Sequence, residues 1–89
     1  MESQKILEQQ CKALGQERRI RILVFLKKHR RGSVGEIAKN IHCSIPVVSQ
    51  HLRVLREAGI IIDRRRGMRV LYVLSVHMSM VARTVVKAL

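Results

Sequence analysis

The chain has 89 residues, with 18 Lys and Arg against 6 Asp and Glu, and therefore a formal net charge of +12. This length predicts one small domain over residues 1–89 and leaves too little chain for an enzyme built around a deep pocket. Because like charges repel, the excess of positive charge predicts a polyanionic partner.

Hydrophobic residues make up 47% of the chain, yet there is one Phe, one Tyr and no Trp. An aliphatic composition of this kind favours a compact helical body, and its excess predicts a second apolar surface that a partner chain covers. The N-terminus lacks the pattern of a signal peptide, and no apolar run approaches the ~18 residues that span a membrane. Two cysteines do not form a secreted disulfide framework, so we expect a cytoplasmic protein without membrane contact.

Helical periodicity predicts three helices in the first half of the chain. Apolar residues at intervals of three or four place the first over about residues 2–14 and the second over about residues 16–30. Ser33 and Glu36 have the spacing of a capping box, in which each side chain accepts a hydrogen bond from the other residue's backbone N–H. A short third helix is therefore predicted to begin after Ser33.

The string CSIPVVSQHLRVLREAG predicts a fourth helix. Ser44 suits the N-cap, Pro46 is tolerated in the first turn, and Gly59 suits the position after the C-terminus. The short third helix, a tight link and this helix predict a helix-turn-helix over about residues 33–59, whose second helix fits a DNA major groove.

Two β-branched runs follow, over residues 60–64 and 69–74, on either side of a turn at Gly67. They predict a β-hairpin, or wing, over about residues 60–74. Ser75 is expected to cap a last helix over residues 76–89. The predicted fold is mainly α with a small β-hairpin, a winged helix-turn-helix in the order helix, helix, helix, helix, strand, strand, helix.

The fourth helix has two different faces. Val48, Leu52 and Leu55 share one face and are expected to anchor the helix to the body. The other face carries residue types that reach DNA, since Gln pairs with adenine, Arg with guanine or phosphate, and an apolar side chain with a thymine methyl. The residues of this segment predicted to contact DNA are Ser44, Pro46, Val47, Ser49, Gln50, His51 and Arg53. Two alternatives stay open: a merely solvated polar face, and a packing contact for His51.

The predicted wing carries Arg64, Arg65, Arg66 and Arg69 around its turn. Mutual repulsion of these side chains destabilises the fold unless an anion lies opposite, and the neighbouring acidic residues are too few to balance them. The four arginines are therefore predicted to contact the DNA minor groove or its phosphates. The alternative is a charge run that only keeps the protein soluble.

The last helix is apolar on nearly every side, which predicts pairing with a second copy of the chain together with the first helix. Packing within one chain is the alternative for about half of these side chains. A twofold dimer would set two recognition helices ~34 Å apart and read a pseudo-palindrome. The residues predicted to lie at the dimer interface are Leu7, Cys11, Met78, Val81, Val85 and Leu89.

The strings GQERRIRILVFL, SVGEIAKNIHCSIPVVSQHLRVLREAGII and DRRRGMRVLYVL together resemble the ArsR/SmtB family of winged-helix bacterial and archaeal repressors. The resemblance covers about residues 12–76 and rests most on SQHLRVLREAG followed by a basic wing. It implies a homodimer, with the first and last helices at the interface, that represses transcription by occupying an operator and leaves it when an inducer binds.

Metal-sensing members of that family carry ligand patterns that this sequence lacks. Ala38 and Asn40 stand where a Cys-x-Cys motif would supply two thiolates. In the last helix His77 is retained, but Ala88 stands where a second histidine should be. Because zinc and its relatives need several converging ligands, no metal site and no cofactor are predicted.

Thiol sensing is an alternative that the two cysteines leave open. Cys11 lies in the first predicted helix, and Cys43 lies where the family usually carries a buried Leu or Val. Buried cysteines are most often small hydrophobic residues. If these thiols are exposed, their basic neighbours Lys12 and His42 would favour a reactive thiol.

No catalytic pattern is present: the sequence has no glycine-rich phosphate loop, no suitably spaced carboxylate pair and no nucleophile with its base. We therefore predict a regulator rather than an enzyme. It would bind double-stranded DNA sequence-specifically as a homodimer and act as a repressor released by a signal. The alternative is a nonspecific basic architectural or protein-binding winged helix.

Overall fold

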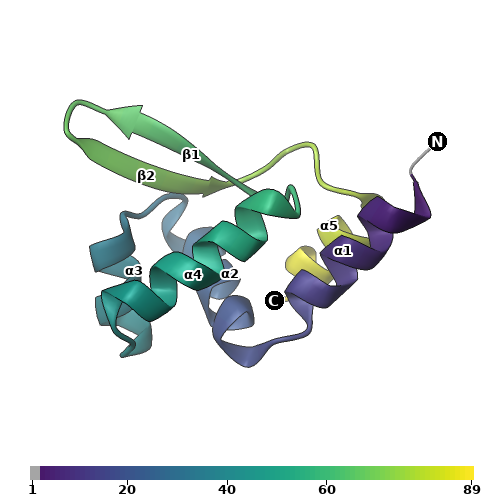
Figure 1. Cartoon of the computed structure of the whole chain (residues 1–89), viewed down its shortest axis with the longest axis horizontal. Helices are drawn as coiled ribbons and strands as arrows, with labels where there is room; N and C mark the ends of the chain where they lie inside the picture. Colours follow the sequence, from purple (N-terminus) through teal and green to yellow (C-terminus); the bar gives the residue numbers. More distant parts are fainter. Residues whose placement is uncertain (1–2) are drawn as a thin grey trace.

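A computed structural model describes residues 3–89 of the protein. The predicted winged helix-turn-helix is confirmed, and α1 and α5 lie side by side at the end opposite the free tip of the hairpin (Figure 1). The elements are, in chain order, α1 (Gln4–Leu14), α2 (Glu17–His29), α3 (Val34–Ile41), α4 (Ile45–Glu57), β1 (Ile61–Arg66), β2 (Arg69–Leu74) and α5 (Met80–Lys87).

Side-chain oxygens cap the helices as their residue types suggest. The predicted capping box of α3 is present, because Ser33 Oγ accepts from Glu36 N and Glu36 Oε1 accepts from Ser33 N. Ser44 caps α4, with Pro46 in its first turn. These bonds satisfy backbone N–H groups that a helix start otherwise leaves unpaired.

The predicted start of the last helix is wrong. Ser75 does not cap it; the Ser75 hydroxyl accepts instead from His77 N at 3.0 Å and closes a local turn. The helix begins at Met80, after Ser79, whose hydroxyl accepts from Ala82 N at 3.1 Å. Serine suits either role, so local chemistry alone does not select between the two positions.

Gly59 and Gly67 both have a positive φ, which glycine adopts more readily than other residues. Gly59 lies just beyond α4 at φ +79°, and the predicted stop of that helix is confirmed. Gly67 has φ +61° and is followed by Met68 in the two-residue turn of the hairpin, as in a type II′ turn. The hairpin is antiparallel and its strands pair over their full length, from Ile61 opposite Leu74 to Arg66 opposite Arg69.

α2 is the central helix of the core, with Ile22, Leu23 and Leu26 fully or almost fully buried. α4 packs on this body through Val48, Leu52 and Leu55, as predicted from their spacing. Within residues 3–89, none of the helices combines the length and apolar character that crossing a bilayer requires.

The buried face of α1 includes a polar residue that sequence reasoning did not single out. Gln10 is buried there together with Ala13 and Leu14. Its Nε2 donates to Ala58 O at 2.9 Å, and its Oε1 accepts from Ser79 N at 3.2 Å. The buried amide thus joins the end of α4 to the start of α5, and a hydrocarbon side chain could satisfy neither backbone group.

Candidate nucleic-acid interface

The outward face of α4 presents three exposed polar side chains. With its apolar side held in the core, the helix leaves Ser49, Gln50 and Arg53 exposed to solvent. Together with Pro46 these side chains line a shallow depression of about 310 Å³. The three predicted base-reading residues therefore share one accessible surface, as a helix lying in a major groove requires.

The start of α4 places three more of the predicted residues beside that face. Ser44 and Pro46 are exposed, and Val47 is half-buried. Ser44 Oγ already accepts from Val47 N at 3.4 Å, which leaves the hydroxyl hydrogen free to donate elsewhere. Sequence reasoning missed Ile45, which is exposed at the first position of the helix. Its place directly after the N-cap serine was the signal that could have identified it.

His51 points to a different part of the molecule. It is half-buried, and its Nδ1 lies 3.3 Å from Arg19 Nη1 at the start of α2. Since a guanidinium only donates hydrogen bonds, Nδ1 is the acceptor and His51 is neutral in this contact. Burial lowers the pKa of His51 below its ordinary value of 6.5, and repulsion from Arg19 and Arg18 lowers it further. The geometry thus favours the packing alternative for His51 over a DNA contact.

The free end of the wing projects beyond the helices (Figure 1), and the arginines Arg64, Arg65 and Arg66 lie in the half of β1 next to the turn. Arg64, Arg65 and Arg66 are exposed, and among residues 3–89 none of the three has a carboxylate within 4.0 Å. Met68 at the turn is 97% exposed, which sequence reasoning did not anticipate. Its position directly after the turn glycine is the feature of the sequence that could have indicated this exposure. The wing is therefore a cationic hairpin with an apolar tip.

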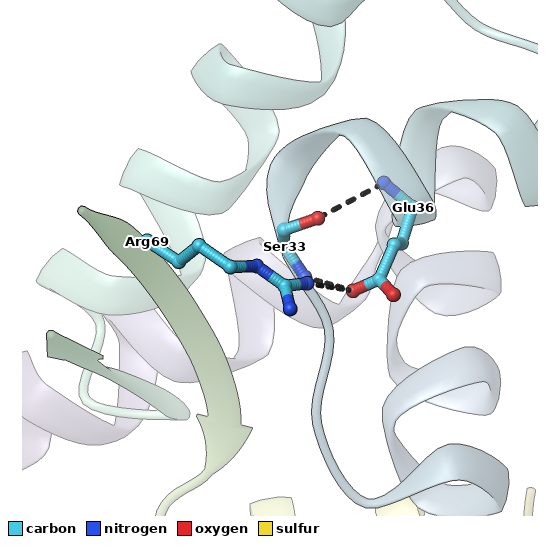
Figure 2. Close-up of polar contacts among 3 residues, drawn as sticks. All are labelled: Ser33, Glu36 and Arg69. Atoms are coloured by element: carbon cyan, nitrogen blue, oxygen red, sulfur yellow. Dashed lines mark hydrogen bonds and ion pairs between the residues drawn. The ribbon is translucent and has the colours of Figure 1, made fainter. Parts of the chain in front are cut away.

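Arg69 differs from the other wing arginines because it has a partner. Figure 2 shows its guanidinium beside Glu36 in the first turn of α3, with Nη2 3.2 Å from Oε1. Hydrogen bonds from the Ser33 backbone and hydroxyl lower the pKa of Glu36, and the charges of Arg69 and Arg31 lower it further. This pairing was absent from the sequence prediction. Asp63 likewise pairs with Arg56, at 3.8 Å, rather than with the wing arginines.

The predicted dimer residues divide between surface and core. Cys11, Val81 and Leu89 are exposed, and Leu7 and Val85 are half-buried. Met78 is only 6% exposed and packs in the protomer's own core, so it offers no outer surface and the prediction for it is corrected. Large apolar side chains outside the predicted set are also exposed, on α1, at the start of α5 and in the segment before it. The α1–α5 apolar surface consists of Ile6, Val76, Met80, Val81 and Leu89.

The two cysteines lie in different settings. Cys11 is exposed on α1, whereas Cys43 is half-buried against the core and its thiol donates to Ile41 O at 3.6 Å. Both are free thiols. Within residues 3–89, no three His, Cys, Asp or Glu side chains converge in a way that could hold a metal ion.

Comparison with known proteins identifies relatives of the same architecture. The family model described as "Bacterial regulatory protein, arsR family" matches residues 16–63. The HTH-type transcriptional repressor SmtB of Mycobacterium tuberculosis is 39% identical over 66 residues, which cover 74% of this chain and 48% of that protein. The chain spans about half the length of the curated relatives it matches.

Two solved structures extend the likeness over nearly the whole chain. HlyU from Vibrio cholerae is 31% identical with a TM-score of 0.81, covering 99% of this chain and 92% of that chain. The second is the homodimeric winged helix-turn-helix DNA-binding domain of a Mycobacterium bovis protein described as a possible ArsR-family transcriptional regulator. It is 28% identical with a TM-score of 0.81, covering 94% of this chain and 77% of that one.

Proposed function

The chain belongs to the arsR family of bacterial regulatory proteins, and from this premise we propose that it is a sequence-specific, DNA-binding transcription regulator that acts as a homodimer. One observation carries the proposal. The polar outer face of α4, with Ser49, Gln50 and Arg53, lies in the same unit as a wing whose Arg64, Arg65 and Arg66 have no carboxylate partner among residues 3–89.

In the proposed complex α4 lies in the major groove. Gln50 is placed to pair with an adenine edge, and Arg53 with guanine or with the phosphate beside it. The wing arginines neutralise backbone phosphates or enter the adjacent minor groove, where a narrow groove attracts arginine. Base contacts give the specificity, and the wing gives a large share of the affinity.

The α1–α5 apolar surface supports the homodimer. Met80 is 81% exposed and Val81 45% exposed on a helix whose other side is buried, and covering this surface with a second copy would remove it from water. The Mycobacterium bovis domain that shares the fold is described as homodimeric. A twofold axis through this surface would place two α4 helices about one turn of duplex apart, at ~34 Å.

In this proposal the bound protein occupies an operator that overlaps a promoter, and it thereby represses transcription. We favour repression because two of the similar proteins carry the names transcriptional repressor SmtB and arsenical resistance operon repressor. Another, HlyU of Vibrio cholerae, is named a transcriptional activator. Release by a signal, and a place in the cytoplasm beside the chromosome, belong to the same proposal.

The test compares duplexes from upstream of the protein's own gene with random duplexes of equal length, by fluorescence anisotropy at physiological salt. We expect tighter binding to one upstream site, and a loss of that preference in Gln50→Ala. Gln4→Ala, a matched change at an exposed α1 position, should leave binding unchanged. If the wild-type protein binds all duplexes equally, the proposal fails and a nonspecific architectural role replaces it.

A further inference from the structure

Arg69 and the other wing arginines have different surroundings, and Glu36 is the cause. A single oxygen, Glu36 Oε1, accepts from Ser33 N at 2.9 Å and from Arg69 Nη2 at 3.2 Å (Figure 2). One carboxylate therefore belongs both to the cap of α3 and to the second strand of the wing. These two elements are 33 residues apart in the sequence.

The capping box fixes the position of this carboxylate before Arg69 meets it. Ser33 Oγ accepts from Glu36 N at 3.2 Å, so the two residues hold each other through their backbones as well as their side chains. Since the glutamate rotamer is already set, little side-chain entropy is left to lose when the ion pair forms. The pKa of Glu36 lies below its ordinary value of 4.5, so the carboxylate is charged at neutral pH and over a wider acidic range than a free carboxyl.

The base of the wing is held by other contacts. Gly32 N donates to Tyr72 O at 3.1 Å, and Tyr72 N donates to Gly32 O at 2.8 Å, so β2 is hydrogen-bonded to the segment just before α3. Gly32 is required there, because a Cβ at this position would lie 2.5 Å from Phe25 Cε1. Arg69 lies three residues further toward the tip, ~10 Å along the strand.

The outer part of the wing, residues 64–70, has few ties to the helical body. Within residues 3–89, the bond from Arg69 to Glu36 is the one side-chain hydrogen bond or ion pair that joins residues 64–70 to a helix. A two-stranded hairpin is only marginally stable by itself. Both partners are more than half exposed, and exposed ion pairs contribute little to overall stability. Any effect of the pair is therefore expected to be local to the wing rather than on overall stability.

We propose that Glu36 is a positioning residue for the wing: by holding Arg69, it sets the angle at which Arg64, Arg65 and Arg66 are presented relative to α4. The inference rests on the proposed DNA binding. It also gives Arg69 a role other than the DNA contact suggested by its sequence, because Arg69 acts through Glu36 on the three arginines beyond it.

The first test uses the DNA-free protein. In Glu36→Gln the amide oxygen can still accept from Ser33 N, so the cap is kept, while the negative charge that attracts Arg69 is removed. We expect 15N order parameters of the Arg64–Arg66 amides to fall from about 0.85 toward 0.6 or below, with Tyr72 unchanged. Glu8→Gln removes a comparable exposed ion pair, Glu8 with Lys12 on α1, and should leave the wing rigid. A wing equally rigid in Glu36→Gln overturns the proposal.

The second test measures operator affinity against salt. Glu36→Gln should weaken binding about tenfold, the order of one charge-assisted hydrogen bond, without steepening the salt dependence. Arg69→Gln should weaken it to a similar extent, and the double variant no further, because both changes break the same ion pair.

Two further outcomes would each overturn one proposal, either the positioning role of Glu36 or the proposed DNA-binding function. Glu36→Gln could instead tighten binding and make the slope of log affinity against log salt steeper by the amount that one further neutralised phosphate contributes. In that case Arg69 contacts DNA itself, and the positioning role is overturned. If the wild-type protein shows no operator preference, the proposed function fails, while the order parameters of the free protein still decide whether Glu36 holds the wing.

Discussion

α4 and α5 begin in the same way and bury the same kind of face, yet they leave opposite surfaces to solvent. Each starts after a serine N-cap, Ser44 or Ser79. α4 exposes Ser49, Gln50 and Arg53, whereas α5 exposes Met80 and Val81 in its first turn. Burial within the protomer therefore does not distinguish the two helices. What distinguishes them is the partner proposed for each exposed face, DNA for α4 and a second copy of the chain for the apolar part of α5.

The two surfaces are held in a fixed relation by a buried contact. Gln10 bonds Ala58 O at the end of α4 and Ser79 N at the start of α5. In a homodimer the distance between the two α4 helices depends on how α5 is placed relative to α4. Any change to the α1–α5 apolar surface should therefore also affect binding to a pseudo-palindromic operator with two half-sites.

The largest effect is expected from Val81→Asp. In a dimer this places an unpaired charge in the apolar interface, which costs several kcal/mol. Operator affinity should fall by about 100-fold or more, since each ~1.4 kcal/mol is a factor of ten. Analytical ultracentrifugation should show a folded monomer. Val81→Ala, which removes contact area without adding charge, should give a much smaller shift. A variant that stays dimeric would place the interface elsewhere.

Arg53→Ala should have the next largest effect, on the other surface. Removal of a base contact is expected to cost about 1–3 kcal/mol at the specific site and little on random duplex. Arg56→Ala, three residues further along α4, is the matched control because Arg56 pairs with Asp63. Binding curves for both variants on both duplexes check this. Equal losses for the two variants would mean that the helix contributes charge alone.

Neutralising one wing arginine, as in Arg66→Gln, should change the salt dependence more than the specificity. The slope of log affinity against log salt should decrease by about 0.9 on any DNA sequence, because the variant neutralises one phosphate fewer. Arg21→Gln removes the same charge from an exposed position on α2 and should leave the slope unchanged. If the two variants change the slope equally, only the net charge of the protein matters, and the position of the arginine on the wing does not.

The smallest effect concerns pH and the His51–Arg19 contact, which lies on the inner side of α4. The pKa of His51 is lowered in the folded protein, so the unfolded chain binds a proton more readily. This contribution to stability is complete above the ordinary value of 6.5 and is lost as the pH falls below it. Thermal unfolding of the wild type should therefore show a loss toward pH 5.5 that His51→Gln lacks. Parallel profiles would exclude the titration of His51 as the cause.

The sequence by itself determined the elements and much of their chemistry. The spacing of Val48, Leu52 and Leu55 decided which side of α4 is buried, because helical periodicity is local. The Ser33–Glu36 capping box and the glycine of the wing turn were readable for the same reason, since each acts within a few residues. The polar face of α4 and the basic hairpin followed from these elements.

Tertiary structure alone decided which of these groups meet. The bonds made by Gln10 span 48 and 69 residues, the His51–Arg19 contact spans 32, and the Glu36–Arg69 pair spans 33. Residue type predicts that a glutamine or an arginine needs a partner, but the partner depends on how whole elements pack. For that reason the sequence placed four arginines on the wing alike, whereas the fold joined Arg69 to α3 and left the other three facing solvent.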